Sequence, residues 1–403
     1  VGLPKEYAKK LFEPFMVKKL TEMGAARTSL EAQALLVEGT SKHIDTALER
    51  VMSERPVLLK RDPALHSYSV QAFHPKIAAS KAIEMHPLAC GGFGADFDGD
   101  TMSVYVPLHK DAVDEAHKMM PSQNLFAKAT GKLMYTPTLE YAFGMYKLSD
   151  VGKHVDQKFS HPADVLKAFQ SGKLLHNDVV SLGEKKTTAG RLLLATGVPE
   201  GMQNDVMHNL DLRLDKKGAE SLLSSIAKKH PDKFAHYVNR LKDLGAGCST
   251  GYIEAPIASP TQAIGTAPIM KFHMPAHTLT LKDLEVDHAV RDPILKKARK
   301  EVEAVTLTSG LTQGEKDRRA IDIYTKADEE MYKAHTAHAK LNPNHLMQLN
   351  MAGIKPGKAQ YQQIVLAPML MKNSKNETIP TPITNAYSEG LDLGQYWTGM
   401  HGA

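Results

Sequence analysis

The chain has 403 residues, of which 42% are hydrophobic and 24% charged, a composition typical of a folded globular protein with two or three domains. Its 50 basic and 45 acidic residues leave a net charge of only +5, which does not by itself indicate a nucleic-acid partner. The two cysteines, Cys90 and Cys248, lie far apart, which excludes an all-cysteine zinc site and a disulfide framework, and no apolar run is long enough to span a membrane.

The first half of the chain predicts helices on either side of a region of short strands. Phe12 and Met16 recur four residues apart, as on one face of a helix, and Thr28–Glu31 has the pattern of a helix start. Residues 51–110 are rich in prolines and short strand signals, and Thr101–Val106 alternates apolar and polar residues, as a half-buried strand does. Helices and loops alternate after residue 110.

The second half predicts a loop-rich insertion followed by long helices. Residues 246–285 are rich in Gly, Pro, Ser and Thr without a strong period, which indicates a loop-rich or β insertion. Residues 293–340 have helical periodicity. Within them, one apolar stripe consists of Ala320, Ile323, Ala327 and Met331.

The segment Gly94–Thr101, with the sequence GADFDGDT, places three carboxylates within five residues. Two like charges about 4 Å apart repel by about 4 kcal/mol at an effective dielectric of about 20, so such a group splays into solvent, takes up protons or binds a cation. In a straight strand Asp96 and Asp100 would lie about 13 Å apart, too far to share one ion. A shared ion therefore requires the segment to curl, and Gly99 provides the backbone freedom for the curl.

Three other interpretations of this segment are a solvated acidic turn, a calcium loop and a phosphatase motif. A calcium loop needs Gly at its sixth place and Glu at its twelfth, where this chain has Thr101 and Pro107. The DxDG phosphatase motif would make Asp96 the nucleophile and Asp98 the acid. It also needs an apolar strand before the first aspartate, whereas residues 91–95 are glycine-rich.

Ordered motifs flank the acidic cluster within residues 55–106. They are KRDPALHS at 60–67, QAFHP at 71–75, KAIEMHPLAC at 81–90 and GADFDGD at 94–100. In the same order, they resemble the NRxPTLHR, QAFxP, KAIxxHPLVC and NADFDGD motifs of the beta-prime subunit, the largest catalytic subunit of multisubunit DNA-dependent RNA polymerases. Further along the chain, TTAGR at 187–191 and SGLTQGEKDRRAID at 309–322 resemble segments of the same family.

The resemblance implies an α+β multidomain fold with a double-psi β-barrel at the active site. The implied domains are a helical lead-in (1–50), the double-psi β-barrel with its metal-binding loop (51–110), a helical or mixed pore and funnel-like region (111–245), a loop-rich diverged insertion (246–292), a helical region with an F-loop-like segment (293–380) and the truncated start of the bridge helix (381–403).

The resemblance also implies the roles of individual residues. Asp96, Asp98 and Asp100 would hold the catalytic Mg2+ for two-metal nucleotidyl transfer from NTPs onto the RNA 3′ end. Arg61 would bind the substrate by donating to the ribose 2′-hydroxyl. Gly94 departs from the family Asn whose amide contacts the ribose hydroxyls, so ribose recognition would fall more heavily on Arg61.

The implied enzyme is a DNA-directed RNA polymerase that is active only in an assembly. Its partners would be a beta-like RNA polymerase subunit, the remaining beta-prime fragments, the DNA template, the RNA transcript and NTPs, with no membrane partner. The departures from the family motifs favour a split, bacteriophage-encoded version working in the bacterial host cytoplasm or packaged in the virion. The alternatives are an RNA-dependent RNA polymerase of the two-barrel type, a DxDG-type phosphatase and a non-catalytic scaffold.

Overall fold

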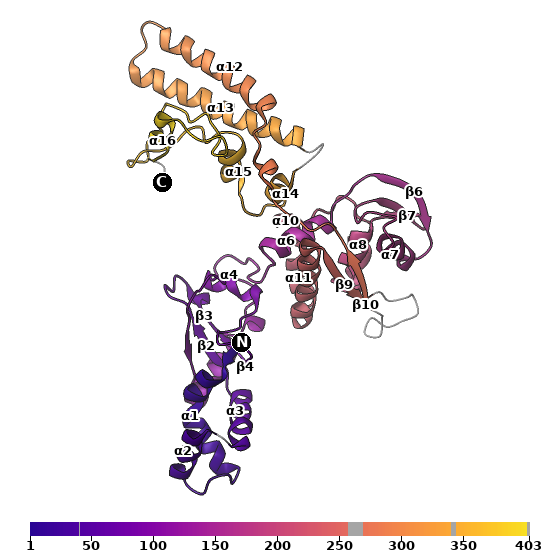
Figure 1. The fold of residues 1–403 in the computed structure, drawn as a ribbon, viewed down its shortest axis with the longest axis vertical. Coiled ribbons are helices and arrows are strands. Elements are labelled where there is room, and N and C mark those ends of the chain that lie inside the picture. The colour runs from indigo at the N-terminus through magenta and orange to yellow at the C-terminus, as the bar shows by residue number, and fades with distance from the viewer. Residues whose placement is uncertain (40, 257–268, 340–343, 401–403) are drawn as a thin grey trace. The chain divides into compact units, whose positions relative to one another are not determined.

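The computed structural model describes residues 1–39, 41–256, 269–339 and 344–400, and the chain forms two compact units. The first unit comprises Val1–Pro137 and Glu220–Asn239, and the second comprises Thr138–Ala219 and Arg240–Ala403. Helices and small sheets occur in both units, so the predicted α+β class is confirmed (Figure 1). Among the helices in these described ranges, none has the length and apolar character needed to cross a membrane.

The first unit begins with the predicted helical lead-in. Its helices are α1 (Lys5–Glu22), α2 (Ser29–Glu38) and α3 (Lys42–Glu54). Helix α1 buries the row Ala8, Phe12, Met16 and Leu20, as the four-residue spacing predicts. The helix start at Thr28 is also confirmed, because the Thr28 side chain accepts a hydrogen bond from the backbone N–H of Glu31.

The short strands after α3, together with β1 near the N-terminal end, form two small sheets. Strand β2 (Val57–Lys60) lies between β3 (Val70–Phe73) and β5 (Ser103–Tyr105) and is antiparallel to both. Strand β1 (Gly2–Pro4) pairs in parallel with β4 (Lys76–Ala78). Strand β5 is the central part of the alternating segment predicted as a strand.

The predicted double-psi β-barrel does not appear as a closed sheet in the described part of residues 51–110. A closed barrel requires every strand to pair on both edges. Here each strand has only three or four residues, and the segments between strands form turns instead of continuing the ladder. The sheets β1–β4 and β3–β2–β5 therefore remain separate.

The rest of the first unit combines short helices with turns and loops. Helix α4 (Cys90–Phe93) precedes the acidic segment, and α5 (Lys110–Lys118) follows β5. Short 3₁₀ turns in the chain lie at Ser67–Ser69, Pro87–Ala89, Pro121–Gln123, Pro231–Lys233 and Leu281–Leu284. Phe12, Leu59 and Phe93 are among the buried core residues, so helix α1, strand β2 and helix α4 share one apolar core.

The second unit contains a three-stranded sheet with helices around it. The sheet order is β6–β7–β8, with β6 and β7 parallel and β7 and β8 antiparallel. The elements of this unit up to the insertion are α6 (Leu139–Leu148), β6 (His154–Phe159), α7 (Pro162–Gln170), β7 (Val179–Leu182), β8 (Lys185–Thr187), α8 (Ala189–Ala195) and α9 (Glu200–His208). Helix α10 (Lys216–Lys229) begins in the second unit and continues into the first at Glu220, and α11 (Phe234–Thr250) begins in the first unit and continues into the second at Arg240. The predicted insertion contains an antiparallel pair, β9 (Tyr252–Pro256) and β10 (Ile269–His273), and its residues 257–268 lie outside the described ranges.

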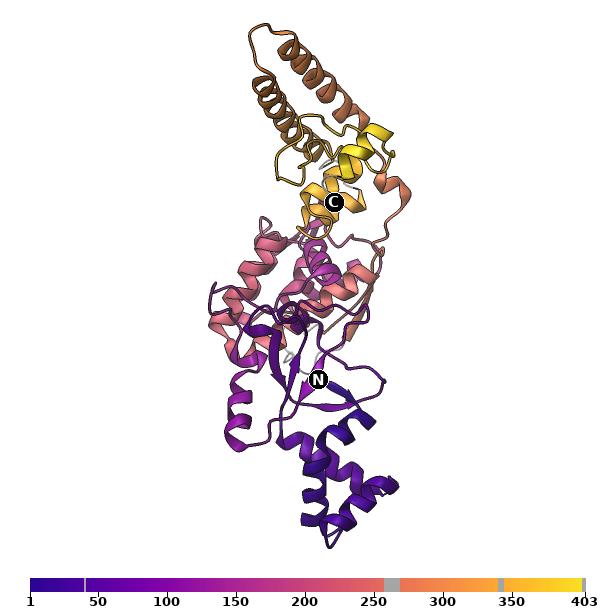
Figure 2. The same ribbon diagram turned by 90° about the vertical axis from the view of Figure 1, so that its left-hand side faces the viewer.

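The C-terminal part of the second unit contains the predicted long helices. Helices α12 (His288–Leu307) and α13 (Gln313–Ala339) lie side by side in both views (Figures 1 and 2). Ala320, Ala327 and Met331 of the predicted stripe are buried, and Ile323 is half-buried. The remaining helices are α14 (His345–Met351), α15 (Lys358–Val365) and α16 (Leu393–Met400). Helix α16 lies in the predicted bridge-helix segment 381–403, whose residues 401–403 are outside the described ranges.

Candidate metal centre

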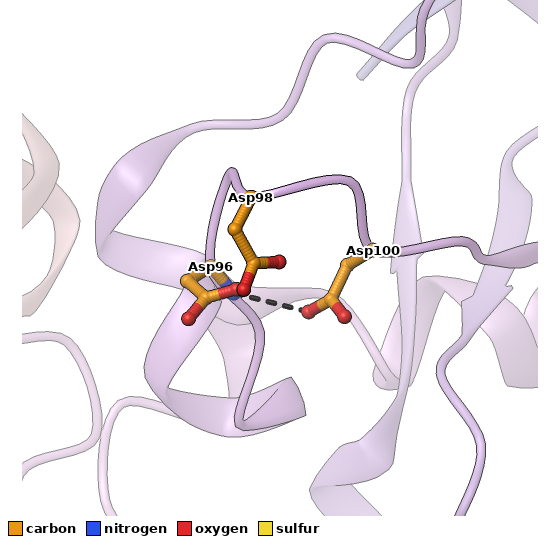
Figure 3. A group of neighbouring side chains, drawn as sticks. All are labelled: Asp96, Asp98 and Asp100. Atoms are coloured by element: carbon orange, nitrogen blue, oxygen red, sulfur yellow. Dashed lines mark hydrogen bonds between the residues drawn. The ribbon is translucent and has the colours of Figure 1, made fainter.

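The acidic segment forms a curled loop between α4 and β5. Gly94 ends α4 in the left-handed conformation with φ 58°, and Gly99 has φ 117°. Within the loop, the backbone N–H of Asp96 donates to Oδ2 of Asp100 over 3.2 Å (Figure 3). The curl predicted from the spacing and from Gly99 is therefore present. Gly94 also satisfies the left-handed helix end that Asn adopts readily, so the departure from the family motif leaves the backbone path intact.

The curl brings the three predicted carboxylates together. One oxygen each of Asp96, Asp98 and Asp100 lies within 4.8 Å of the other two (Figure 3). In the ranges that the structure describes, no other group of three or more His, Cys, Asp or Glu side chains has this spacing. Carboxylate oxygens are the ligands that hard divalent cations such as Mg2+ prefer, so this donor set fits such an ion.

Arg61 lies directly beside the triad. It follows the last residue of β2, and the register that pairs Lys60 with Ser103 of β5 brings it next to the end of the acidic loop. Its Nε donates to Oδ2 of Asp100 over 2.8 Å and its Nη2 donates to Oδ1 over 3.1 Å. The sequence motifs placed Arg61 at the active site as a ribose-binding residue. The structure places it at the site and pairs it with a metal-ligand candidate.

The charges of the loop shift two of the three carboxyl groups in opposite directions. The Arg61 guanidinium, and then the Asp96 backbone N–H, hold the pKa of Asp100 below its ordinary value. A hydrogen bond with the Asp96 carboxyl group, together with the negative charge of that group, raises the pKa of Asp98. The repulsion expected from the sequence is therefore concentrated between Asp96 and Asp98. A divalent cation would relieve it.

A cleft of about 800 Å³ opens beside the triad within the first unit. Its walls come from the start of α1, from residues of the KAIEMHPLAC motif and from the acidic loop. The residues are Pro4, Glu6, Tyr7, Lys81, Ala82, Ile83, Met85, Ala95, Asp96, Phe97, Gly99, Asp100, Thr101 and Met102. The volume lies in the range of small-molecule sites. Lys81 belongs to the KAIEMHPLAC motif, but it was not among the residues that the motifs predicted for the site.

A histidine of the KAIEMHPLAC motif and the two cysteines have simple structural environments. His86 accepts a hydrogen bond at Nδ1 from the backbone N–H of Leu88 over 3.2 Å, at the start of a 3₁₀ turn. Cys90 and Cys248 are both free thiols, in agreement with the absence of a disulfide framework in the sequence pattern.

The sequence of the first unit is similar to that of a known protein family. Residues 1–122, which contain α1 to α5, both sheets and the acidic loop, match the family described as RNA polymerase Rpb1, domain 2. The acidic triad and Arg61 both lie inside the matched residues.

Whole-chain comparison extends the similarity to the second unit. The chain is 32% identical over 428 positions to the DNA-directed RNA polymerase subunit beta' of Sulfurihydrogenibium sp. (strain YO3AOP1), and the match covers 100% of this chain and 25% of that protein. It is 32% identical to the subunit beta' of Syntrophobacter fumaroxidans and 33% identical to that of Thermodesulfovibrio yellowstonii, covering 30% and 29% of those proteins. The chain thus spans between a quarter and a third of the length of these relatives and is similar to one continuous part of them.

Proposed function

We propose that this chain is a beta-prime-type catalytic fragment of a multisubunit DNA-directed RNA polymerase, in which Asp96, Asp98 and Asp100 hold the catalytic Mg2+. The observation that carries the proposal is the approach of three carboxylate oxygens within 4.8 Å of one another. This group lies in the segment that matches the RNA polymerase family.

The chain's own residues would supply the cation site and the room for a substrate. Asp96, Asp98 and Asp100 would be the ligands, and the left-handed Gly99 keeps them on one side of the loop. A bound Mg2+ stabilises negative charge on phosphate oxygens, the chemistry that nucleotidyl transfer to an RNA 3′ end requires. The cleft beside the triad has the volume to accept a nucleotide, and Lys81 in its wall would attract the phosphates.

The partners in this proposal are a beta-like subunit, the remaining beta-prime fragments, the DNA template, the RNA transcript and NTPs. Support comes from the names of the relatives, which are subunits of DNA-directed RNA polymerases. We further propose a split, bacteriophage-encoded subunit acting in the host cytoplasm, because Gly94 stands where the family motif has Asn. Mass spectrometry of the native complex would identify the co-purifying subunits.

We also propose that the two small sheets are parts of the double-psi β-barrel implied by the family. The parallel pair β1–β4 and the sheet β3–β2–β5 share one apolar core, as two sections of a barrel wall would. The barrel would close once the missing strand pairings form in the assembled enzyme.

The phosphatase alternative lacks its structural requirement. That motif needs a buried strand directly before the first aspartate, whereas helix α4 and the left-handed Gly94 precede Asp96 here. The two-barrel RNA-dependent polymerase receives no support from the relatives, which are named as DNA-directed enzymes.

The decisive experiment tests the triad in the assembled polymerase. Asp98→Asn should lower RNA extension on a DNA template at least about 100-fold, because Lewis-acid stabilisation by a metal is worth several kcal/mol. Asp114→Asn, which removes the same charge from the exposed surface of α5, is the matched control and should retain full activity. Full extension by the Asp98→Asn complex would support the scaffold alternative, and phosphoester hydrolysis through a covalent Asp96 intermediate would support the phosphatase.

A further inference from the structure

We propose that Arg61 is a positioning residue of the metal centre, which holds the Asp100 carboxylate in place beside the carboxylates of Asp96 and Asp98. This inference rests on the proposed function, because it concerns the same triad. It adds a role in metal binding that is independent of any contact between Arg61 and a nucleotide.

The first observation is the geometry of the ion pair. Arg61 uses two N–H groups on two different carboxylate oxygens, over 2.8 Å and 3.1 Å, so the guanidinium plane and the carboxylate plane are held together as a fork. The Arg61 and Asp100 side chains are only 26% and 22% exposed. The pair is therefore more constrained than a single-contact ion pair on an open surface.

The second observation is how the donors are divided between the two oxygens. Oδ2 of Asp100 accepts from Arg61 Nε and from the backbone N–H of Asp96, whereas Oδ1 accepts only from Arg61 Nη2. A carboxylate has about four lone-pair positions. Three of them are thus engaged by N–H donors, two of which come from Arg61, so the orientation of the Asp100 carboxylate depends mainly on Arg61.

The third observation is that Arg61 connects the loop to a sheet. Arg61 directly follows β2, its backbone N–H donates to the carbonyl of Ser69 over 3.4 Å, and the preceding Lys60 is in register with Ser103 of β5. Few atoms pack against the loop at its two glycines, since a Cβ atom added at Gly94 or at Gly99 would meet no atom within 4 Å. The fork therefore holds Asp100 in a fixed place relative to the sheet β3–β2–β5.

Charge and geometry predict opposite effects on cation binding, which makes the proposal testable. The positive charge of Arg61 repels a cation, so a purely electrostatic role means that neutral variants bind metal more tightly. A positioning role means that loss of the fork weakens binding even when the charge is kept. Arg61→Lys keeps the charge and loses the fork, because an ammonium group is a single point of contact.

The experiment measures Mn2+ binding to the full 403-residue chain without nucleotide, from the electron paramagnetic resonance signal of free Mn2+. The unmodified chain should bind Mn2+ at a site that Asp98→Asn removes. Arg61→Lys should weaken that binding about 10-fold, the lower end of what loss of a ligand-orienting partner causes. Arg61→Gln should bind no more tightly than the unmodified chain.

The matched control is Arg27→Lys, the same chemical change at an exposed position of the first unit. It should leave Mn2+ binding unchanged, and circular dichroism of every variant should match that of the unmodified chain. Unchanged binding by Arg61→Lys, or tighter binding by Arg61→Gln, would overturn the inference and leave the proposed function standing. Absence of any Asp98-dependent Mn2+ binding would contradict the proposed function and this inference with it.

Discussion

At the scale of single residues, Arg191 in the second unit is completely buried, and its guanidinium hydrogen-bonds only to backbone carbonyl oxygens. Its Nη2 donates to the carbonyl oxygens of Ser149, Leu210 and Leu212 over 3.0, 3.0 and 2.7 Å, and its Nη1 donates to that of Val206. Burial lowers the pKa of Arg191 to about 10. One guanidinium thus satisfies carbonyl groups at the end of α6, in α9 and in the segment after α9.

Substitution of Arg191 by Met should open this part of the second unit. The change leaves several buried carbonyl groups without a donor, and we expect the local free energy of unfolding to fall by about 3 kcal/mol. Hydrogen exchange of the α8 and α9 amides, measured by mass spectrometry, would report it. Arg213→Met is the control, since Arg213 is 41% exposed and its ion pair with Asp150 should contribute less than about 1 kcal/mol. Equal effects of the two substitutions would contradict this assignment.

At the scale of elements, α13 and α15 are joined by a hydrogen bond to a perturbed carboxyl group. Gln362 Nε2 on α15 donates to Oδ1 of Asp328 on α13 over 2.7 Å. Asp328 is half-buried, and this burial raises its pKa to about 6. The unfolded chain has an ordinary aspartate pKa near 3.9, so between about pH 4 and pH 6 the folded chain binds a proton that the unfolded chain does not. This group therefore lowers the free energy of unfolding as the pH rises through that window.

Asp328→Asn should consequently stabilise the α13–α15 contact at neutral pH. Asparagine retains the acceptor for Gln362 and removes the charge that burial disfavours, so we expect a gain of about 1 kcal/mol at pH 7 after solvent screening. The gain should vanish at about pH 4, where the aspartate of the folded chain is already protonated. Urea denaturation at the two pH values would measure it. Glu329→Gln, a neighbouring exposed position, should show no such difference; a pH-independent gain for Asp328→Asn would contradict the explanation.

The elements that sequence alone predicted are those determined by local pattern. The row Phe12 and Met16, the cap at Thr28 and the curl at Gly99 depend on residues within a few positions of one another, and the structure contains all three. Contacts between distant segments were not predictable in the same way. The approach of Arg61 to Asp100 depends on the pairing of β2 with β5, and the burial of Arg191 depends on carbonyl groups 15 to 42 residues away.

The family resemblance predicted the site residues more accurately than it predicted the fold around them. It identified Asp96, Asp98 and Asp100 as one group, and the structure brings them together. It also implied a barrel over residues 51–110, where the described strands form two separate sheets. Ligand residues close in sequence are brought together by one loop, whereas closure of a barrel depends on many pairings at once.

At the scale of the whole molecule, the described residues form an open cleft beside the triad and provide few groups that could bind a substrate. Asp96 and Asp98 are exposed, and of the described residues that line the adjacent cleft, Lys81 alone is basic. A nucleoside triphosphate carries several negative charges, and rapid phosphoryl chemistry depends on holding them in a fixed position away from water. One lysine on an open wall does not provide such a clamp, so under the proposed function the remaining phosphate-binding groups would come from partner subunits.

The isolated 403-residue chain should therefore bind Mn2+ at the triad and still fail to extend an RNA primer on a DNA template. The native complex should extend the same primer, and a complex carrying Asp98→Asn should not, which separates failure of assembly from failure of the metal centre. Adding the separated subunits back to the isolated chain should restore extension, because they would supply the missing contacts to template and triphosphate. The contrary result would be primer extension by the chain alone that disappears in Asp98→Asn. In that case the chain's own groups would be sufficient for the reaction, and no phosphate-binding groups from other subunits would be needed.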